Sequence, residues 1–214
     1  MGWLLPVEAA LFVGVFLADD YGFIPITKTP LLLLIAWASL RLRGQRWRDV
    51  GLVRPDGWMR ALAIGAAAGI AMELLALWVT EPLIARLVGA DPGLEEFRPL
   101  VGNLRLTFIL IAVMWPLAAF AEEMIYRGYL MHRVAGMGNR GSWIVALIAA
   151  TVVFGYAHAP GQGLAGALQE GWSGLLLGLL YLANQRTLTV PIVAHGVANT
   201  LAFVLIYLGR YPGV

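Results

Sequence analysis

Long apolar runs, separated by short polar links, dominate the pattern along this chain. A membrane-spanning helix needs roughly 20 mostly apolar residues, and runs of about this length recur from one end of the sequence to the other. Seven runs stand out, at about 3–18, 23–40, 60–80, 105–131, 142–157, 170–184 and 190–208. The pattern predicts an all-α, polytopic transmembrane helix bundle with seven spans, or with eight if a further, broken span is present.

Composition supports this prediction and excludes several classes of protein. Of the 214 residues, 60% are hydrophobic and 13% are charged, whereas soluble domains carry about 25% charged residues. These values favour one integral membrane domain over residues 1–214. The chain has no cysteine, which excludes disulfides, thiol catalysis and cysteine metal sites.

The positive charges are almost all arginines, and they gather on alternate links between the apolar runs. The link between the second and third runs holds Arg41, Arg43, Arg46, Arg48, Arg54 and Arg60. The next link, at 81–104, carries mostly acids. This positive-inside pattern predicts a cytoplasmic N-terminus and, for seven spans, an external C-terminus. We interpret the net charge of +2 as a topology signal in a bacterial inner membrane and not as a nucleic-acid-binding surface.

Two pairs of glycines stand four residues apart within the apolar runs. They are Gly65 with Gly69, and Gly174 with Gly178. Glycines at this spacing share one helix face and let a second backbone approach closely in lipid. The pairs therefore predict tight helix packing.

The fourth apolar run contains three charged residues, in the segment FAEEMIYRG from Phe120 to Gly128. Ionisable residues are costly inside a span, so they are usually paired or face a cavity. Glu123 and Arg127 are four residues apart, share a helix face and can pair. Glu122 points about 100° away from Glu123 and lacks that partner, which makes it a candidate general base.

Two further polar motifs follow at the same spacing of four residues. Phe154 and His158 share a helix face at the end of the fifth run, in the segment FGYAH. His195 and Asn199 do so near the start of the last run, in HGVAN. Two hydrogen-bonding side chains on one face can converge on a small target, although His and Asn also form helix–helix hydrogen bonds in membranes.

Helix depth places two of these groups at the same level. Glu122 lies about 21 Å from the turn that begins near Gly136, and His158 lies about 24 Å from it on the returning helix, at roughly 1.5 Å per residue. His195 lies only about 8 Å into its own span. Either the preceding link NQRTLTVP dips into the membrane, or the helices tilt.

Two other carboxylates, Glu8 and Glu73, stand alone in apolar runs. Neither has a partner in a recognisable motif. Each is therefore expected either to brace neighbouring helices or to face a cavity, and the sequence assigns no further role to them.

The motifs EEMIYR, FGYAH and HGVAN, in this order on hydrophobic helices, resemble those of the CPBP family. This family comprises type II CaaX prenyl proteases and their bacteriocin-processing and immunity relatives. Its pattern is two glutamates, three residues and an arginine; then Phe, three residues and His; then His, three residues and Asn or a small residue. The resemblance runs from about Phe120 to Asn199, within a motif-bearing core at about 105–208.

The resemblance implies an intramembrane endopeptidase that hydrolyses peptide bonds of membrane-associated substrates. Its expected partners are a peptide or membrane-protein substrate and the lipid bilayer. The catalytic residues that it implies are Glu122, His158, His195 and Asn199, and the supporting residues are Glu123, Arg127 and Phe154.

Two chemical schemes fit these residues, so the expected cofactor is either none or zinc. In a metal-free scheme, Glu122 activates a water and His158 assists, while His195 and Asn199 stabilise the oxyanion. In a zinc scheme, Glu122, His158 and His195 bind the ion and a water takes the fourth place. The absence of an HExxH motif favours the metal-free scheme.

Two other functions compete with the protease. A bacteriocin-immunity or scaffold protein of the same fold would bind a partner without catalysis, which leaves the four polar motif residues without a purpose. A proton-coupled transporter would use the buried carboxylates as a proton relay. Many transporters have inverted repeats, and we find none in this sequence.

Overall fold

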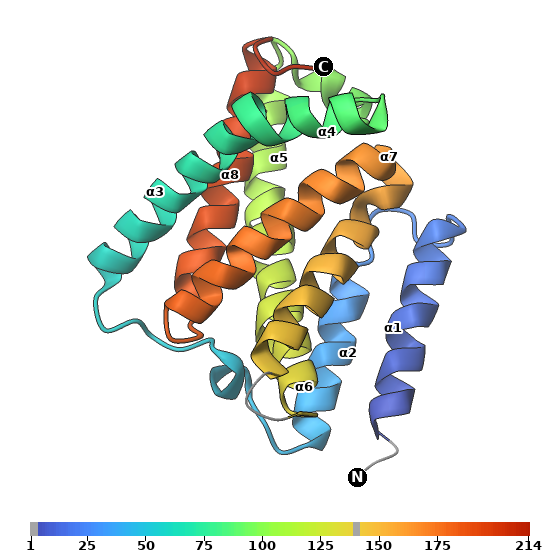
Figure 1. The fold of residues 1–214 in the computed structure, drawn as a ribbon, viewed down its shortest axis with the longest axis vertical. Coiled ribbons are helices and arrows are strands. Elements are labelled where there is room, and N and C mark those ends of the chain that lie inside the picture. The colour runs from blue at the N-terminus through green and yellow to red at the C-terminus, as the bar shows by residue number, and fades with distance from the viewer. Residues whose placement is uncertain (1–3, 139–141) are drawn as a thin grey trace.

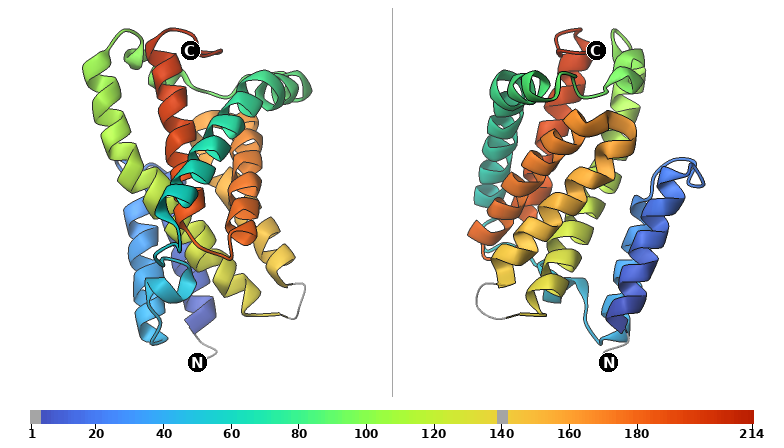
Figure 2. Two further views of the ribbon diagram at one scale, coloured as in Figure 1. Left: turned by 90° about the vertical axis from the view of Figure 1, so that its left-hand side faces the viewer. Right: turned by 45° about the vertical axis from the view of Figure 1, so that its right-hand side comes forward.

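The computed structural model describes residues 4–138 and 142–214, and every regular element in these ranges is a helix (Figure 1, Figure 2). Residue 3, with which the first predicted span begins, lies outside them. The elements are α1 (Leu4–Asp20), α2 (Thr29–Leu42), η1 (Trp47–Val50), α3 (Trp58–Leu75), η2 (Ala76–Thr80), α4 (Glu81–Val88), η3 (Glu95–Leu100), α5 (Leu104–Met114), η4 (Trp115–Glu122), η5 (Met124–Leu130), α6 (Met131–Ala135), α7 (Ser142–Ala183) and α8 (Thr189–Tyr207). The all-α prediction is confirmed.

Four helical stretches among the described residues are long and apolar enough to cross a membrane. They are Trp58–Val88, Leu104–Ala135, Ser142–Ala183 and Thr189–Tyr207. α2 is also apolar but has only 14 residues. The predicted count of seven or eight spans is therefore not confirmed, although helix lies in each of the seven predicted ranges.

The longest helix, α7, consists of two arms that meet at Gly163 (Figure 1). Gly163 has φ 68° and ψ −168°, a backbone conformation that favours glycine. The arms lie so close that a Cβ built on Gly155 would be 2.5 Å from the backbone oxygen of Ala167. The fifth and sixth predicted spans correspond to these two arms. The residues between these two spans, 158–169, extend the arms and are helical except at Gly163.

The helix that carries the glutamate motif is not a regular α-helix. Between α5 and α6 it runs through two π-helical stretches, η4 and η5, and Glu122 and Glu123 stand at their junction. Pro116, near the start of η4, has no N–H to donate to the preceding turn. Single π-helical turns occur frequently at functional sites, and here they set the direction of both glutamates.

α3 packs tightly against α8 through the first glycine pair. A Cβ built on Gly65 would lie 2.6 Å from the Cβ of Val193, and one on Gly69 would lie 2.4 Å from the backbone oxygen of Ala194. Only glycine fits at such distances without displacing a helix. This is the close approach that the glycine spacing predicts, and it fixes α8 beside α3.

The link between α7 and α8 packs against the chain after η1, although Gln185 and Arg186 within it are exposed. Leu188, the last residue of this link, is fully buried and donates its N–H to the backbone oxygen of Gly51 at 2.9 Å. A Cβ built on Gly51 would lie 2.5 Å from the backbone oxygen of Arg186, so the chain after η1 covers this turn.

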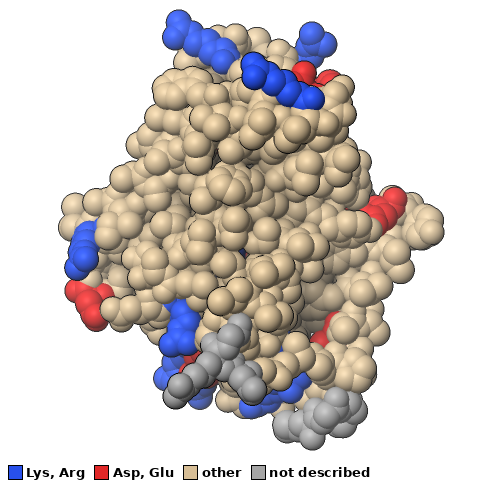
Figure 3. Space-filling view, in the orientation of Figure 1, with Lys and Arg blue, Asp and Glu red and all other residues tan. Residues whose placement is uncertain are grey.

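The surface has the charge distribution of a membrane protein. Charged side chains gather toward the two ends of the face in Figure 3 and at its lateral edges, and its broad centre is almost free of them. Large apolar side chains are exposed along the helices, among them Phe108, Ile144 and Val152. Exposed apolar surface of this extent indicates contact with a membrane or partner. With its four long apolar helices, the chain is an integral membrane protein.

Candidate active site

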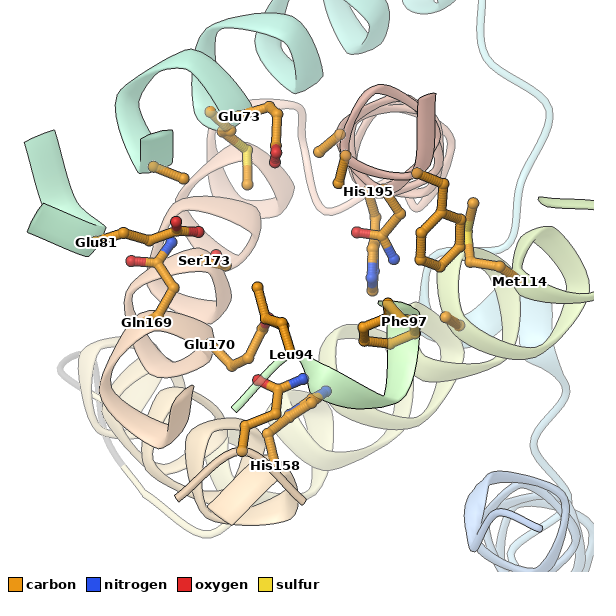
Figure 4. A pocket seen from close by; sticks show the side chains of 18 of the residues that line it. Glu73, Glu81, Leu94, Phe97, Met114, His158, Gln169, Glu170, Ser173 and His195 are labelled. Atoms are coloured by element: carbon orange, nitrogen blue, oxygen red, sulfur yellow. The ribbon is translucent and has the colours of Figure 1, made fainter. Parts of the chain in front are cut away.

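The three sequence motifs meet at one cavity of about 320 Å³. Its lining includes all four residues to which the sequence assigns catalytic roles: Glu122 of η4, His158 of the first arm of α7, and His195 and Asn199 of α8. In Figure 4, His158 and His195 approach the space from different helices. The shared lining agrees with the similar depth expected for Glu122 and His158.

Glu123 and Arg127 form a buried ion pair, as their spacing predicts. Nη1 of Arg127 donates to Oε1 of Glu123 at 2.6 Å, and the two side chains are 1% and 0% exposed. Nη2 of Arg127 donates to the backbone oxygen of Gly174 at 2.9 Å, which joins η5 to the second arm of α7. Arg127 is therefore engaged on two sides, and this leaves Glu122 without an arginine partner.

His195 shares Glu123 with Arg127, a contact that the sequence did not predict. Its Nδ1 lies 2.9 Å from Oε1 of Glu123. Because a carboxylate accepts hydrogen bonds, Nδ1 carries the proton and donates. Nε2 is then the free ring nitrogen, which is a donor only when the ring is doubly protonated. A carboxylate at Nδ1 favours this charged form of the imidazole.

His158 is oriented by its own helix. Its Nδ1 lies 2.9 Å from the backbone oxygen of Phe154, and a carbonyl oxygen only accepts, so Nδ1 is again the protonated nitrogen. In the neutral ring, Nε2 has a free lone pair that can accept a proton or a hydrogen bond. The spacing of Phe154 and His158 therefore fixes the tautomer as well as the helix face.

The ring of Phe154 links the charged groups of the site. Arg127 lies over this buried ring at 4.6 Å from its centroid. The rings of His158 and His195 lie 4.9 and 6.1 Å from it, centroid to centroid. A guanidinium over an aromatic face gains a cation–π interaction. Phe154 thus acts as the packing centre between the arginine and both histidines.

Among the described residues, Glu122 has one hydrogen-bond partner, which no sequence motif indicates. The hydroxyl of Thr29, at the start of α2, donates to Oε1 of Glu122 at 3.4 Å. Thr29 is buried and lies 93 residues away in the sequence. No motif marks it, so only the packing of α2 against η4 could reveal the contact.

The motif on α8 is held against η4 by a glycine between its two polar residues. A Cβ built on Gly196 would lie 2.4 Å from the ring of Trp115, so the helix and the indole are in close contact. Nε1 of Trp115 donates to Oγ1 of Thr200 at 3.2 Å. These contacts fix the face of α8 from which His195 and Asn199 reach the cavity.

A zinc site would need at least three protein ligands around one ion. Within residues 4–138 and 142–214, no three His, Cys, Asp or Glu side chains are grouped so that they could hold a metal ion. Glu122, His158 and His195 line the same cavity but do not form such a group. As arranged here, they do not fit a zinc centre.

Of the two isolated carboxylates, Glu8 braces helices. Its Oε1 accepts a hydrogen bond from the hydroxyl of Ser39 at 2.5 Å and its Oε2 one from Nη2 of Arg43 at 2.9 Å. Both partners lie at the end of α2, so Glu8 joins α1 to α2. The sequence left two roles open for Glu8, bracing neighbouring helices or facing a cavity, and these contacts give it the first.

Glu73 instead faces the cavity, together with Glu81 and Glu170. No sequence motif marks the last two, since Glu81 falls in the acidic link at 81–104 and Glu170 at the very start of the sixth apolar run. Glu81 accepts a hydrogen bond from the hydroxyl of Tyr211 at 2.7 Å. Burial, with the nearby carboxylates of Glu73 and Glu81, raises the pKa of Tyr211 above its ordinary value. The hydroxyl therefore keeps its proton and remains a donor.

Comparison with known proteins supports the motif assignment. A family model described as Rce1-like, type II CAAX prenyl endopeptidase Rce1-like, matches residues 104–201. No curated protein and no solved structure matches the chain. The matched segment begins with α5 and ends within α8, so it contains all three motifs. The predicted resemblance to the CPBP family is confirmed.

Proposed function

Residues 104–201 match the Rce1-like model of type II CAAX prenyl endopeptidases, and on this premise we propose that the chain is an intramembrane endopeptidase acting on membrane-associated substrates. The family points to a protease, which is a hydrolase. One observation supports the proposal most strongly. An acid, two imidazoles and a carboxamide from three helical segments line one cavity within a bundle of apolar helices.

Glu122 is the proposed base. Its carboxylate accepts a proton from a water in the cavity, while the water oxygen bonds to the carbonyl carbon of the scissile peptide. Thr29 donates to Oε1 of Glu122 and restricts its orientation. Nε2 of His158, left free by the bond from Nδ1 to Phe154, accepts a hydrogen bond from the same water. Positioned proton transfer of this kind accelerates reactions by about 10²–10⁴-fold.

His195 and Asn199 are the proposed oxyanion donors. Attack by water places a negative charge on the former carbonyl oxygen, and preorganised donors stabilise it. The amide of Asn199 supplies N–H groups. His195 supplies an Nε2–H only as imidazolium, the form that the hydrogen bond from its Nδ1 to Glu123 favours. Glu123 and Arg127 therefore contribute by holding the charge and orientation of His195.

Collapse of the tetrahedral intermediate completes the hydrolysis. The C–N bond breaks, the nitrogen leaves as an amine with the proton that Glu122 took from water, and the oxyanion becomes part of the new carboxyl group. Glu122 returns to its carboxylate form. Each cycle consumes one water and one peptide bond, so the reaction is balanced without a metal ion.

We also propose a membrane arrangement for this enzyme. α1, α2, the two arms of α7 and the other three long apolar helices would make seven crossings of a bacterial inner membrane. Hydrophobic helices shorter than the bilayer are accommodated by local thinning of the lipid, which suits α2. The substrate would enter from the membrane as a peptide or a membrane protein.

The proposal is tested by comparing membrane peptides from cells that produce the wild type or Glu122→Gln. Glutamine keeps the size of the side chain but cannot take up the proton. The cleavage products found in cells with the wild type should therefore be absent from cells with the variant. Glu95→Gln, an exposed change outside the cavity, is the matched control. Unchanged cleavage in Glu122→Gln would contradict the proposal. Proton-coupled uptake lost in Glu122→Gln, without any cleavage, would indicate a transporter instead.

A further inference from the structure

The half of the cavity away from the histidines is strongly acidic. Five glutamates line the whole space: Glu73, Glu81, Glu96, Glu122 and Glu170. No lysine or arginine among the described residues lines it. In Figure 4, Glu73, Glu81 and Glu170 lie on the side formed by α3, α4 and the second arm of α7. The proposed reaction uses only Glu122, so the other acids need a separate explanation.

Glu73 is the member of this group that points to a ligand. It is only 7% exposed, it lines the cavity, and its carboxylate is directed into the space in Figure 4. Its Oε1 is buried and has no hydrogen-bond partner in the part of the chain that the structure describes. A buried carboxylate oxygen without a partner is costly, and a cation or donor that enters the cavity would remove this cost.

Within residues 4–138 and 142–214, the protein does not supply that cation. Arg127, the buried arginine beside this region, is bound to Glu123 and to the backbone of Gly174. The hydroxyl of Tyr211 donates to Glu81, and Oε1 of Glu73 keeps no partner among the described residues. The acids are not grouped as ligands of a metal ion among the described residues. The arrangement therefore favours an organic cation of the substrate over a divalent metal.

We infer that Glu73, supported by Glu81 and Glu170, forms a subsite for a basic side chain of the peptide substrate. This inference rests on the proposed endopeptidase function, because the subsite shares its cavity with Glu122 and His158. A lysine or arginine a few residues from the scissile bond places its charge among the acids. The substrate backbone then lies beside the histidines. Glu73 is thus a specificity-determining residue.

The same charges disfavour a free carboxylate at this end of the cavity. A CaaX substrate carries its cleaved segment at the C-terminus of the chain, so its terminal carboxylate lies close to the scissile bond. Like charges in one desolvated space repel. We therefore expect internal or N-terminal basic residues, and not a terminal carboxylate, to occupy the acidic half.

The inference is tested with purified protein in liposomes and a set of synthetic apolar peptides. One lysine is moved stepwise along the peptide, and each peptide has a counterpart with glutamine at that position. Wild type should cleave the lysine peptide at one offset from the scissile bond roughly tenfold or more faster in kcat/KM than its counterpart, as expected for a charged hydrogen bond. Glu73→Gln should reduce this preference to about twofold or less, because it lowers kcat/KM for the lysine peptide more than for the glutamine peptide.

Glu95→Gln is the matched control, because it removes an exposed carboxylate of η3 that does not line the cavity. It should keep the full preference for lysine. Equal cleavage of both peptides by the wild type would overturn the subsite. A variant that loses activity on both peptides alike, while its melting temperature is unchanged, would also overturn it.

Binding to Glu122→Gln separates this inference from the proposed function. Peptide affinity for this variant, measured by fluorescence anisotropy, should favour lysine over glutamine, and adding Glu73→Gln should remove the difference. If neither the wild type nor any variant cleaves a peptide, but the lysine peptide still binds more tightly than the glutamine peptide, the endopeptidase proposal fails and the basic subsite stands. If peptides are cleaved without any preference for lysine, the subsite fails and the endopeptidase stands.

Discussion

Glu123 is the residue on which the order of the site depends most. Its Oε1 accepts hydrogen bonds from both Arg127 and His195, so a single buried oxygen links η5 to α8. Its Oε2 is buried without a partner, which makes any loss at Oε1 costly. The carboxylate is therefore a fixed counter-charge, in contrast to Glu122, which has only the long hydrogen bond from Thr29.

Arg127→Ala should destabilise the protein strongly. The change leaves Glu123 buried with one partner fewer and removes the cation over Phe154. Breaking a buried ion pair by removing one partner costs about 3–5 kcal/mol. Arg48→Ala is the control, because its pair with Asp49 is exposed at the surface and should contribute less than about 1 kcal/mol. Thermal unfolding in detergent measures the loss of stability in both variants. Equal losses for Arg127→Ala and Arg48→Ala would contradict a strong contribution of the buried ion pair.

Asn199→Leu should lower the rate of cleavage with little effect on folding. Asn199 lines the cavity and is a proposed donor to the oxyanion. Loss of one such donor typically lowers kcat about 10²–10³-fold. The measurement is kcat and KM on a cleaved peptide, with the melting temperature recorded in parallel. A rise in KM at unchanged kcat would show that Asn199 binds substrate and does not stabilise the transition state.

At the scale of elements, motif spacing predicts contacts within a helix and misses contacts between helices. The spacing of four residues predicts the pair of Glu123 and Arg127, which forms. The hydrogen bond from Thr29 to Glu122 and that from His195 to Glu123 join residues 93 and 72 positions apart. They depend on how α2 and α8 pack against η4 and η5, and no local pattern encodes this packing.

The helix boundaries show the same limit. Apolar runs predict where helices lie, because the need to bury backbone groups in lipid applies to every span. They do not show that α7 folds back at Gly163 or that the glutamates stand where two π-helical stretches meet. The fold-back occurs at Gly163, whose φ of 68° favours glycine, and η4 begins beside Pro116.

Gly69→Ala should separate α3 from α8. The added methyl group would lie 2.4 Å from the backbone oxygen of Ala194, and backbone cannot yield as a flexible side chain can. Overpacking of this kind costs about 1–3 kcal/mol. Gly14→Ala in α1 is the control, since its Cβ meets nothing within 4 Å. Because α8 carries His195, Gly69→Ala should also lower the rate of cleavage. If Gly69→Ala is as stable and as active as Gly14→Ala, the close packing of α3 against α8 is contradicted.

At the scale of the whole molecule, two charged ends enclose an apolar bundle with a polar cavity inside it. α1 begins and α8 ends at opposite ends of the bundle (Figure 1). The acids and histidines gather around the cavity, whereas the centre of the surface in Figure 3 is almost uncharged. This arrangement keeps water and ionisable groups inside the protein and presents apolar side chains to lipid, as buried polar chemistry in a membrane requires.

The chain has no cysteine of its own. A single introduced cysteine should therefore report the orientation of the bundle without background labelling. Arg46→Cys and Arg210→Cys place exposed thiols on the arginine-rich link and after α8. From the positive-inside rule, a membrane-impermeant maleimide should label Arg46→Cys only from the cytoplasmic side and Arg210→Cys only from the opposite side. Labelling of both from one side would contradict the proposed seven crossings.

The central claim is that Glu122 activates a water for peptide hydrolysis, and isotope incorporation tests it most directly. A peptide found in the membrane comparison is incubated with purified protein in H₂¹⁸O. The account predicts one ¹⁸O in the new carboxyl group of the product with the wild type, and no product with Glu122→Gln. Undiminished cleavage by Glu122→Gln, or a wild-type product that lacks ¹⁸O, would contradict it.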